Sequence, residues 1–214
     1  MAPRKKNADV SPFGRVSAFL DASKEVMIAL SRDLVQRNAV GPSNGGPGEA
    51  EKADFLEAWL VSQGLPAPTR LTPMDGEVPR PNLYLRVPGK DRSRCLWIMS
   101  HLDVVPAGDL DLWKSDPFVM RVEGDRLIGR GVEDNHQGIV ASVMALKALL
   151  AEGVEPACDV GLLFVADEET GSRWGIQWLM ENHADLFNEN DSFIVPDAGN
   201  EDGSLVEIAE KSIL

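Results

Sequence analysis

Two short runs of this chain are apolar at every position, and they constrain the fold more than any other feature. They occupy residues 95–99 and 160–165. A strand presents alternate side chains on its two faces, so a strand that is apolar throughout must be covered on both of them. Helices on both faces of a parallel sheet provide that cover. The two runs therefore predict an α/β fold with a buried, mostly parallel sheet.

Helical and strand-like segments alternate around these runs, which predicts three layers with helices on both faces of the sheet. Residues 41–49 and 65–81 are rich in glycine or proline, so we expect an irregular loop and an extended connector there. Helices are predicted over 15–37 (with a break near Ser23), 51–63, 138–150 and 172–182. Strands are predicted over 82–87, 193–195 and 204–209, and the strand at 193–195 is expected to be buried. Residues 118–122 and 126–128 are predicted to form a hairpin.

The two ends of the chain differ in character from the rest. Residues 1–14 are basic and lack the apolar segment of a secretory signal, so we expect a mobile tail there. The remainder, residues 15–214, reads as part of one domain. The chain ends at Leu214 in an apolar run just after a possible strand, and we therefore expect a truncated piece of a longer protein.

Charge and composition exclude several kinds of partner. The net charge is −13, which argues against nucleic acid and against an anionic membrane surface, because both require a basic face. No apolar run is long enough to predict a membrane span. The two cysteines, Cys95 and Cys158, lie in or beside apolar strands and are predicted to be free thiols. These features favour the cytoplasm.

Histidine or carboxylate side chains follow the predicted strands, at the points where the strands end. His101 and Asp103 follow the run at 95–99, and Asp134 lies in a glycine-flanked turn before a helix. Residues 167–169, Asp-Glu-Glu, follow the run at 160–165, and Asp197 follows the strand at 193–195. Functional groups of α/β sheets gather at the carboxyl ends of strands, so we expect these side chains to meet.

A divalent cation would explain this accumulation of carboxylates, because it converts their mutual repulsion into binding. One histidine with several carboxylates suits zinc, cobalt or manganese better than calcium. Two cations bridged by one carboxylate, about 3.5–4 Å apart, are common in hydrolases. Glu168 and Glu169 are adjacent and point in different directions, so one can ligate while the other acts as a general base. Asp103 can orient the imidazole of His101 from two residues away.

Each of these residues also has an ordinary structural reading. Asp134 could be a helix cap, Asp197 a turn former, and residues 167–169 a solvated turn. The combination favours a metal site over these readings taken singly. His136 lies close to the expected site without an assigned role, and His183 suits the end of a helix.

The segments SHLDVVPAG, GRGVEDNHQG, ADEETGS and PDAG, in this order, resemble the M20 metallopeptidases, a family of deacylases, desuccinylases, carboxypeptidases and dipeptidases. The resemblance implies a zinc-peptidase-like catalytic domain that binds two divalent ions, with zinc expected and cobalt or manganese as alternatives. It implies that His101 and Asp197 bind one metal, Glu169 the other, and that Asp134 bridges them. It also implies that Glu168 is the general base, that Asp103 orients His101, and that the Asp134–Asn135 peptide is cis.

The same resemblance implies a longer protein. Members insert a lid or dimerisation domain after roughly this point and then return to the catalytic sheet with a further metal-binding histidine. Neither part has a counterpart in residues 15–214, so the second metal site is expected to be incomplete. We therefore expect a homodimer for the full-length protein and no activity for this chain alone.

The predicted reaction is metal-dependent hydrolysis of an amide bond in an N-acyl amino acid or a small peptide. Three alternatives stay open: an aminopeptidase of the related M28 type, a non-catalytic domain that retains a metal site, and a structural α/β domain with solvated carboxylates. The order of the motifs favours M20. Retention of Glu168, which is no ligand in this scheme, favours an enzyme.

Overall fold

The computed structural model describes residues 11–198 and residue 200. The helices are α1 (Pro12–Ala22), α2 (Lys24–Val35), α3 (Ala50–Ser62), α4 (Gln137–Ala151) and α5 (Ile176–Asn182). The strands are β1 (Thr69–Leu71), β2 (Met74–Asp75), β3 (Val78–Pro79), β4 (Asn82–Val87), β5 (Asp91–His101), β6 (Arg121–Glu123), β7 (Arg126–Ile128), β8 (Cys158–Val165) and β9 (Ser192–Ile194). The predicted break at Ser23 separates α1 from α2, and the predicted hairpin is formed by β6 and β7.

Five strands form one sheet in the order β1-β4-β8-β5-β9. β5 runs parallel to both β8 and β9, whereas β4 runs antiparallel to both β1 and β8. The α/β class is confirmed, but the sheet is mixed rather than mostly parallel. Residues 88–90 between β4 and β5 are too few for the crossover that parallel strands require. β4 must therefore run antiparallel to β5.

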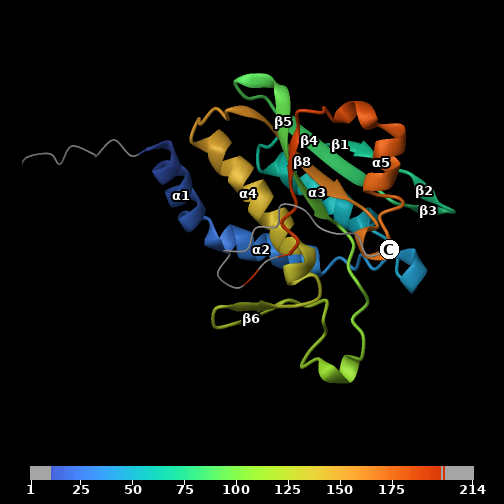
Figure 1. The fold of residues 1–214 in the computed structure, drawn as a ribbon. Helices are drawn as coiled ribbons and strands as arrows, with labels where there is room; N and C mark the ends of the chain where they lie inside the picture. The colour runs from blue at the N-terminus through green and yellow to red at the C-terminus, as the bar shows by residue number, and fades with distance from the viewer. Residues whose placement is uncertain (1–10, 199, 201–214) are drawn as a thin grey trace, which may run out of the picture.

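Helices cover both faces of this sheet, as the apolar runs predict (Figure 1). Leu162 and Phe164 of β8 belong to one core, together with side chains of α2, α3 and α4. Leu163 and Val165 belong to a second core, which Leu179 of α5 completes. Consecutive residues of β8 thus pack on opposite sides, which explains why the strand is apolar throughout.

The connector predicted over 65–81 contains short strands. β1 pairs with the edge of β4, and β2 pairs with β3 in a separate two-stranded hairpin. These strands are two or three residues long, too short to show an alternating pattern among the prolines of this segment. Arg80 follows β3 directly.

The prediction of a buried strand at 193–195 is wrong about burial. β9 lies at the edge of the sheet beside β5, and Phe193, Ile194 and Val195 are 44%, 49% and 49% exposed. Within the described residues no further strand pairs with the outer edge of β9, so an apolar sequence here does not mean a buried strand. The strand predicted over 204–209 lies outside the described residues.

Two further boundaries differ from expectation. α1 begins at Pro12, where Ser11 caps the helix by accepting a hydrogen bond from the backbone N–H of Gly14, so the predicted tail of residues 1–14 overlaps a helix. Residues 1–10 lie outside the described part of the chain. α5 begins at Ile176 rather than at residue 172, because Ser172 has a left-handed backbone, with φ +60°, that a helix does not accept.

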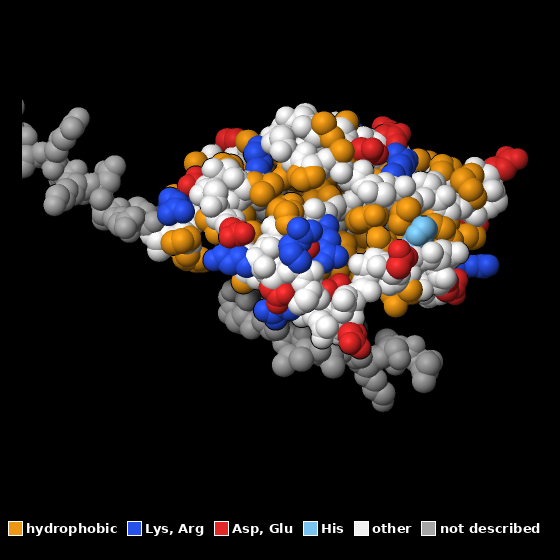
Figure 2. All heavy atoms as spheres, turned by 90° about the horizontal axis from the view of Figure 1, so that it is seen from above, with side chains coloured by type: hydrophobic (Ala, Val, Ile, Leu, Met, Phe, Trp, Pro, Cys, Tyr) orange, Lys and Arg blue, Asp and Glu red, His pale blue; other side chains and the backbone are white. Residues whose placement is uncertain are grey.

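The surface carries charges of both signs. Figure 2 shows Lys and Arg interspersed with Asp and Glu on the face seen from above, with hydrophobic side chains gathered between them. This face therefore has no continuous basic stripe. Among the described residues, no helix combines the length and the apolar composition that a membrane crossing requires.

Candidate metal centre

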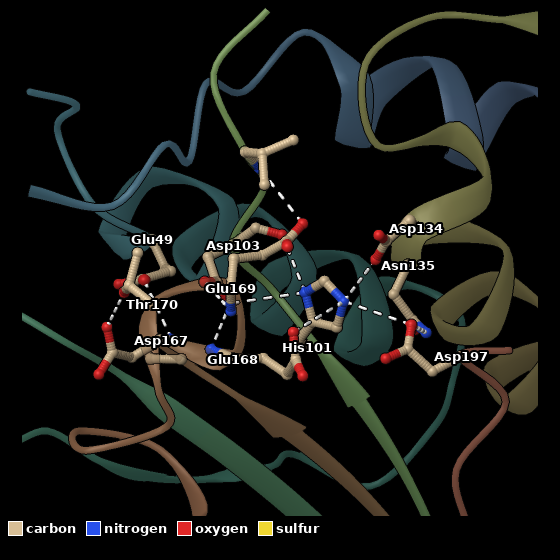
Figure 3. Close-up of polar contacts among 12 residues, drawn as sticks. Glu49, His101, Asp103, Asp134, Asn135, Asp167, Glu168, Glu169, Thr170 and Asp197 are labelled. Carbon is tan, nitrogen blue, oxygen red and sulfur yellow. Dashed lines mark hydrogen bonds and ion pairs between the residues drawn. The ribbon is translucent and has the colours of Figure 1, made fainter. Parts of the chain in front are cut away.

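The parallel strands bring the predicted site residues to one edge of the sheet (Figure 3). His101 is the last residue of β5, and Glu168 and Glu169 follow β8. Asp197 comes after β9, and Asp134 lies in the turn before α4. β5, β8 and β9 run in the same direction, so their carboxyl ends lie together and place these side chains side by side.

His101, Asp134 and Asp197 form a group suited to a metal ion. One ligand atom from each lies within 4.8 Å of the others. The Nε2 atom of His101 lies 2.8 Å from Oδ1 of Asp134 and 3.4 Å from Oδ1 of Asp197. One imidazole nitrogen and two carboxylate oxygens match the ligands that zinc accepts in proteins. These residues therefore fit a divalent cation.

The protonation of His101 supports the same reading. Burial disfavours the imidazolium, but Asp103 and Asp197 outweigh that effect and raise the pKa of His101 to about 11. The surrounding carboxylates thus stabilise positive charge at this point. A metal ion would replace the proton on Nε2, since imidazole ligates in its neutral form.

Asp103 contacts both His101 and the turn after β8. Its backbone oxygen lies 3.0 Å from Nδ1 of His101, while its carboxylate Oδ1 is 3.5 Å from the same nitrogen. The carboxylate instead accepts the backbone N–H groups of Glu168 and Glu169, each at 3.0 Å. The predicted orienting contact is therefore made chiefly by the main chain, and the Asp103 side chain fixes the turn after β8.

Glu168 and Glu169 differ in position. Oε2 of Glu168 is 3.9 Å from Nε2 of His101, and its side chain is 44% exposed. Burial raises the pKa of Glu168, and neighbouring carboxylates add to this effect. Burial and the Asp134 carboxylate raise the pKa of Glu169 to about 7. Among the described residues Glu169 is not part of the three-residue group, so its role as a ligand stays a prediction.

An apolar cavity of about 120 Å³ adjoins Glu168 and His101. Met99, Val165, Ile176 and Val195 provide its apolar wall. This space is next to the group that could hold a metal and beside the partly exposed carboxylate of Glu168. An apolar part of a small substrate could therefore lie there.

Asn135 is a site residue that the sequence did not indicate. Its side-chain Nδ2 donates to Oδ1 of Asp197 at 2.6 Å and to the backbone oxygen of Pro196 at 3.0 Å. The Asp134–Asn135 peptide is cis, as the resemblance implies. Asn135 thus joins the turn that carries Asp134 to the loop that carries Asp197, and only its place beside Asp134 could have drawn attention to it.

A buried ion-pair network holds the turn after β8. Arg80 donates to Glu49 from Nε at 2.8 Å and from Nη2 at 2.6 Å, and to Asp167 from Nη2 at 3.1 Å. The side chains of Arg80 and Glu49 are 1% and 0% exposed. Asp167 has φ +65°, a left-handed backbone that non-glycine residues seldom adopt. The network therefore fixes the residue that directly precedes Glu168 and Glu169.

The remaining histidines and the cysteines lie apart from the three-residue group. The ring of His183 packs on Trp178 at a centroid distance of 5.0 Å. His136 is buried, and its Nε2 lies 2.7 Å from Nζ of Lys52. Cys95 and Cys158 are free, as predicted, although Cys158 is only half-buried.

Known proteins are similar to this chain in sequence. An uncharacterized metallohydrolase of Methanococcus maripaludis is 42% identical over 196 residues, which are 87% of this chain and 47% of that protein. A succinyl-diaminopimelate desuccinylase of Gluconobacter oxydans is 38% identical over 159 residues, which are 72% of this chain and 39% of that protein. The chain thus spans about half the length, or less, of these relatives.

Solved structures share the fold. An M20 family metallo-carboxypeptidase from Sulfolobus solfataricus superimposes with a TM-score of 0.68 at 25% identity, over 83% of this chain and 38% of the other. The family model for peptidase family M20/M25/M40 matches residues 97–209 of the sequence, which is more than half of the 214 residues. This span includes the three residues of the metal group and the two glutamates that follow β8. The chain therefore belongs to peptidase family M20/M25/M40.

Proposed function

We propose that this protein hydrolyses an amide bond in an N-acyl amino acid or a small peptide with the aid of bound divalent cations. The observation that carries the proposal is the meeting of His101, Asp134 and Asp197 beside Glu168. The relatives named as a desuccinylase and a metallo-carboxypeptidase support this substrate class.

The residues that would hold the cations are His101, Asp134, Asp197 and Glu169, and Asp134 would serve both cations. Zinc suits this donor set, and cobalt or manganese would suit it as well. Bound cations would acidify the attacking water and polarise the scissile carbonyl. The chain would hold them through one imidazole and three carboxylates.

Glu168 is proposed as the general base. Its carboxylate is partly exposed beside the group that could hold a metal, and its pKa is raised, which favours acceptance of a proton. In this scheme Glu168 takes a proton from the attacking water at its carboxylate and delivers it to the leaving amine. Asp103 would keep Glu168 in place through its hydrogen bond to the Glu168 backbone.

The domain organisation is part of the proposal. Residues 15–214 would form the N-terminal part of a catalytic domain, because the relatives are about twice as long as the matched region. The rest of the catalytic domain and a lid or dimerisation domain would follow in the full-length protein, which we expect to be a homodimer. Those parts would complete the second metal site, so residues 1–214 alone are expected to be inactive.

A substrate comparison tests this function. The full-length protein with zinc is expected to cleave an N-acyl amino acid at least about tenfold faster, in kcat/KM, than the same compound with its carboxylate converted to an amide. The physical reason is the loss of a charge-assisted hydrogen bond, worth about 1.5–3 kcal/mol. Release of the free amine would be followed by chromatography, with a chelator as control.

Preference for substrates with a free amino terminus, and indifference to the carboxylate, would instead favour an aminopeptidase. No metal-dependent cleavage of any amide would contradict the proposed function.

A further inference from the structure

A buried lysine contacts the turn that carries Asp134. Lys52 is on α3, is 0% exposed, and has its Nζ 2.7 Å from Nε2 of His136, which is 1% exposed. Among the described residues no carboxylate forms an ion pair with it. Burying an amine against a neutral ring is costly, so this contact points to a role beyond packing.

His136 is part of the turn that carries Asp134. Its backbone N–H donates to the backbone oxygen of Gly131 at 2.9 Å, which closes the turn. Its ring lies directly against Gly131, where a Cβ atom would come within 2.6 Å of the ring carbon Cε1. The position of the ring and the shape of the turn therefore depend on each other. Lys52 contacts the same ring from α3.

The charge environment connects Lys52 to Asp103 as well. Burial lowers the pKa of Lys52 to about 7, while the carboxylates of Asp103 and Glu49 act in the opposite direction. The hydrogen bond to His136 does not require the charged form, because a neutral amine also donates. The tie between α3 and the turn therefore persists in either state of Lys52.

We propose that Lys52 and His136 form a positioning pair, which ties α3 to the turn of residues 131–136 and thereby sets the place of the Asp134 carboxylate for metal binding. This inference rests on the proposed function, since it concerns the same metal centre. Neither residue touches a reacting atom in this scheme. The pair acts through Asp134.

Zinc affinity of the 214-residue chain tests the pair. We expect Lys52→Met and His136→Leu each to weaken zinc binding about 10–100-fold, as loss of an outer partner of a metal site typically does. The double variant should lose no more than either single variant, because both remove the same contact. Lys147→Met is the matched control: Lys147 is a partly buried lysine that contacts Gln63, away from the site, and its variant should bind zinc as the wild type does.

Affinity would be measured by competition with a chromophoric chelator, and the absorption spectrum of bound cobalt would report the ligand geometry. We expect the cobalt spectrum to change in both single variants, while urea unfolding shows that they fold. If Lys52→Met does not fold, His136→Leu carries the test.

Zinc binding within about twofold of the wild type in the single variants, an unchanged cobalt spectrum, or additive losses would overturn the positioning role and leave the proposed function intact. Failure of the wild-type chain to bind zinc would overturn the proposed metal centre and the positioning role together.

Discussion

Replacing Glu168 with glutamine is expected to lower kcat of the full-length protein about 10²–10⁴-fold while zinc affinity changes little. Glutamine has nearly the same shape but cannot accept and return a proton, and proton transfer by a positioned side chain contributes a factor of this size. Glu168 is outside the group formed by His101, Asp134 and Asp197, so that group should still bind metal. Turnover and zinc affinity would be measured on the same preparation.

Glu181→Gln provides the control, because Glu181 is an exposed carboxylate on α5. This variant should keep the activity and the zinc affinity of the wild type. Retention of more than about a tenth of the activity by Glu168→Gln would contradict the assignment of Glu168 as the base. A loss of activity that parallels a loss of zinc would instead make Glu168 a ligand.

Replacing Arg80 with methionine is expected to lower the free energy of unfolding by about 3–5 kcal/mol, which is the usual cost of removing one partner of a buried ion pair. Glu49 would be left fully buried without its partner, and Asp167 would lose a hydrogen bond. Urea unfolding of the 214-residue chain, followed by circular dichroism, would measure the change.

Arg70→Met is the matched control for the same substitution in a more exposed setting. Arg70 pairs with Asp54, whose side chain is 66% exposed, and such pairs contribute about 0–1 kcal/mol. Equal losses of unfolding free energy in the two variants would contradict the view that burial makes the Arg80 network stabilise the fold. A stability for Arg80→Met close to that of the wild type would contradict it as well.

The layers of the fold could be predicted because they depend on local pattern. β8 is apolar at every position since each of its faces meets a separate core, and the sequence shows this directly. The same criterion failed for β9, which is apolar and yet exposed at the sheet edge. The antiparallel direction of β4 relative to β5 follows from their short connection, but only the structure shows that β8 lies between the two strands.

The candidate site could be predicted in part for a related reason. His101 ends a strand, Asp103 and Asp197 follow strands, and Asp134 precedes a helix. The topology brings such positions together. Their supporting contacts could not be predicted in this way. Glu49 and Arg80 are 31 residues apart, and Lys52 and His136 are 84 residues apart.

These supporting residues lack a local pattern that would mark them. Glu49 closes a loop rich in glycine and proline, and Arg80 lies in a segment that the sequence presents as a connector. Lys52 lies on α3, and a lysine on a helix normally faces water. Only the folded structure, in which Lys52 is 0% exposed and contacts His136, shows that it is buried.

Calorimetric titration of zinc into the 214-residue chain, beside its Asp134→Ala variant, tests the metal centre most directly. The proposed site predicts tight binding near one equivalent in the wild-type chain, because His101, Asp134 and Asp197 already lie together. In the variant the affinity should fall by more than the 10–100-fold that loss of an outer partner typically costs. Absence of binding by the wild-type chain, or binding that does not depend on Asp134, would contradict the proposed site.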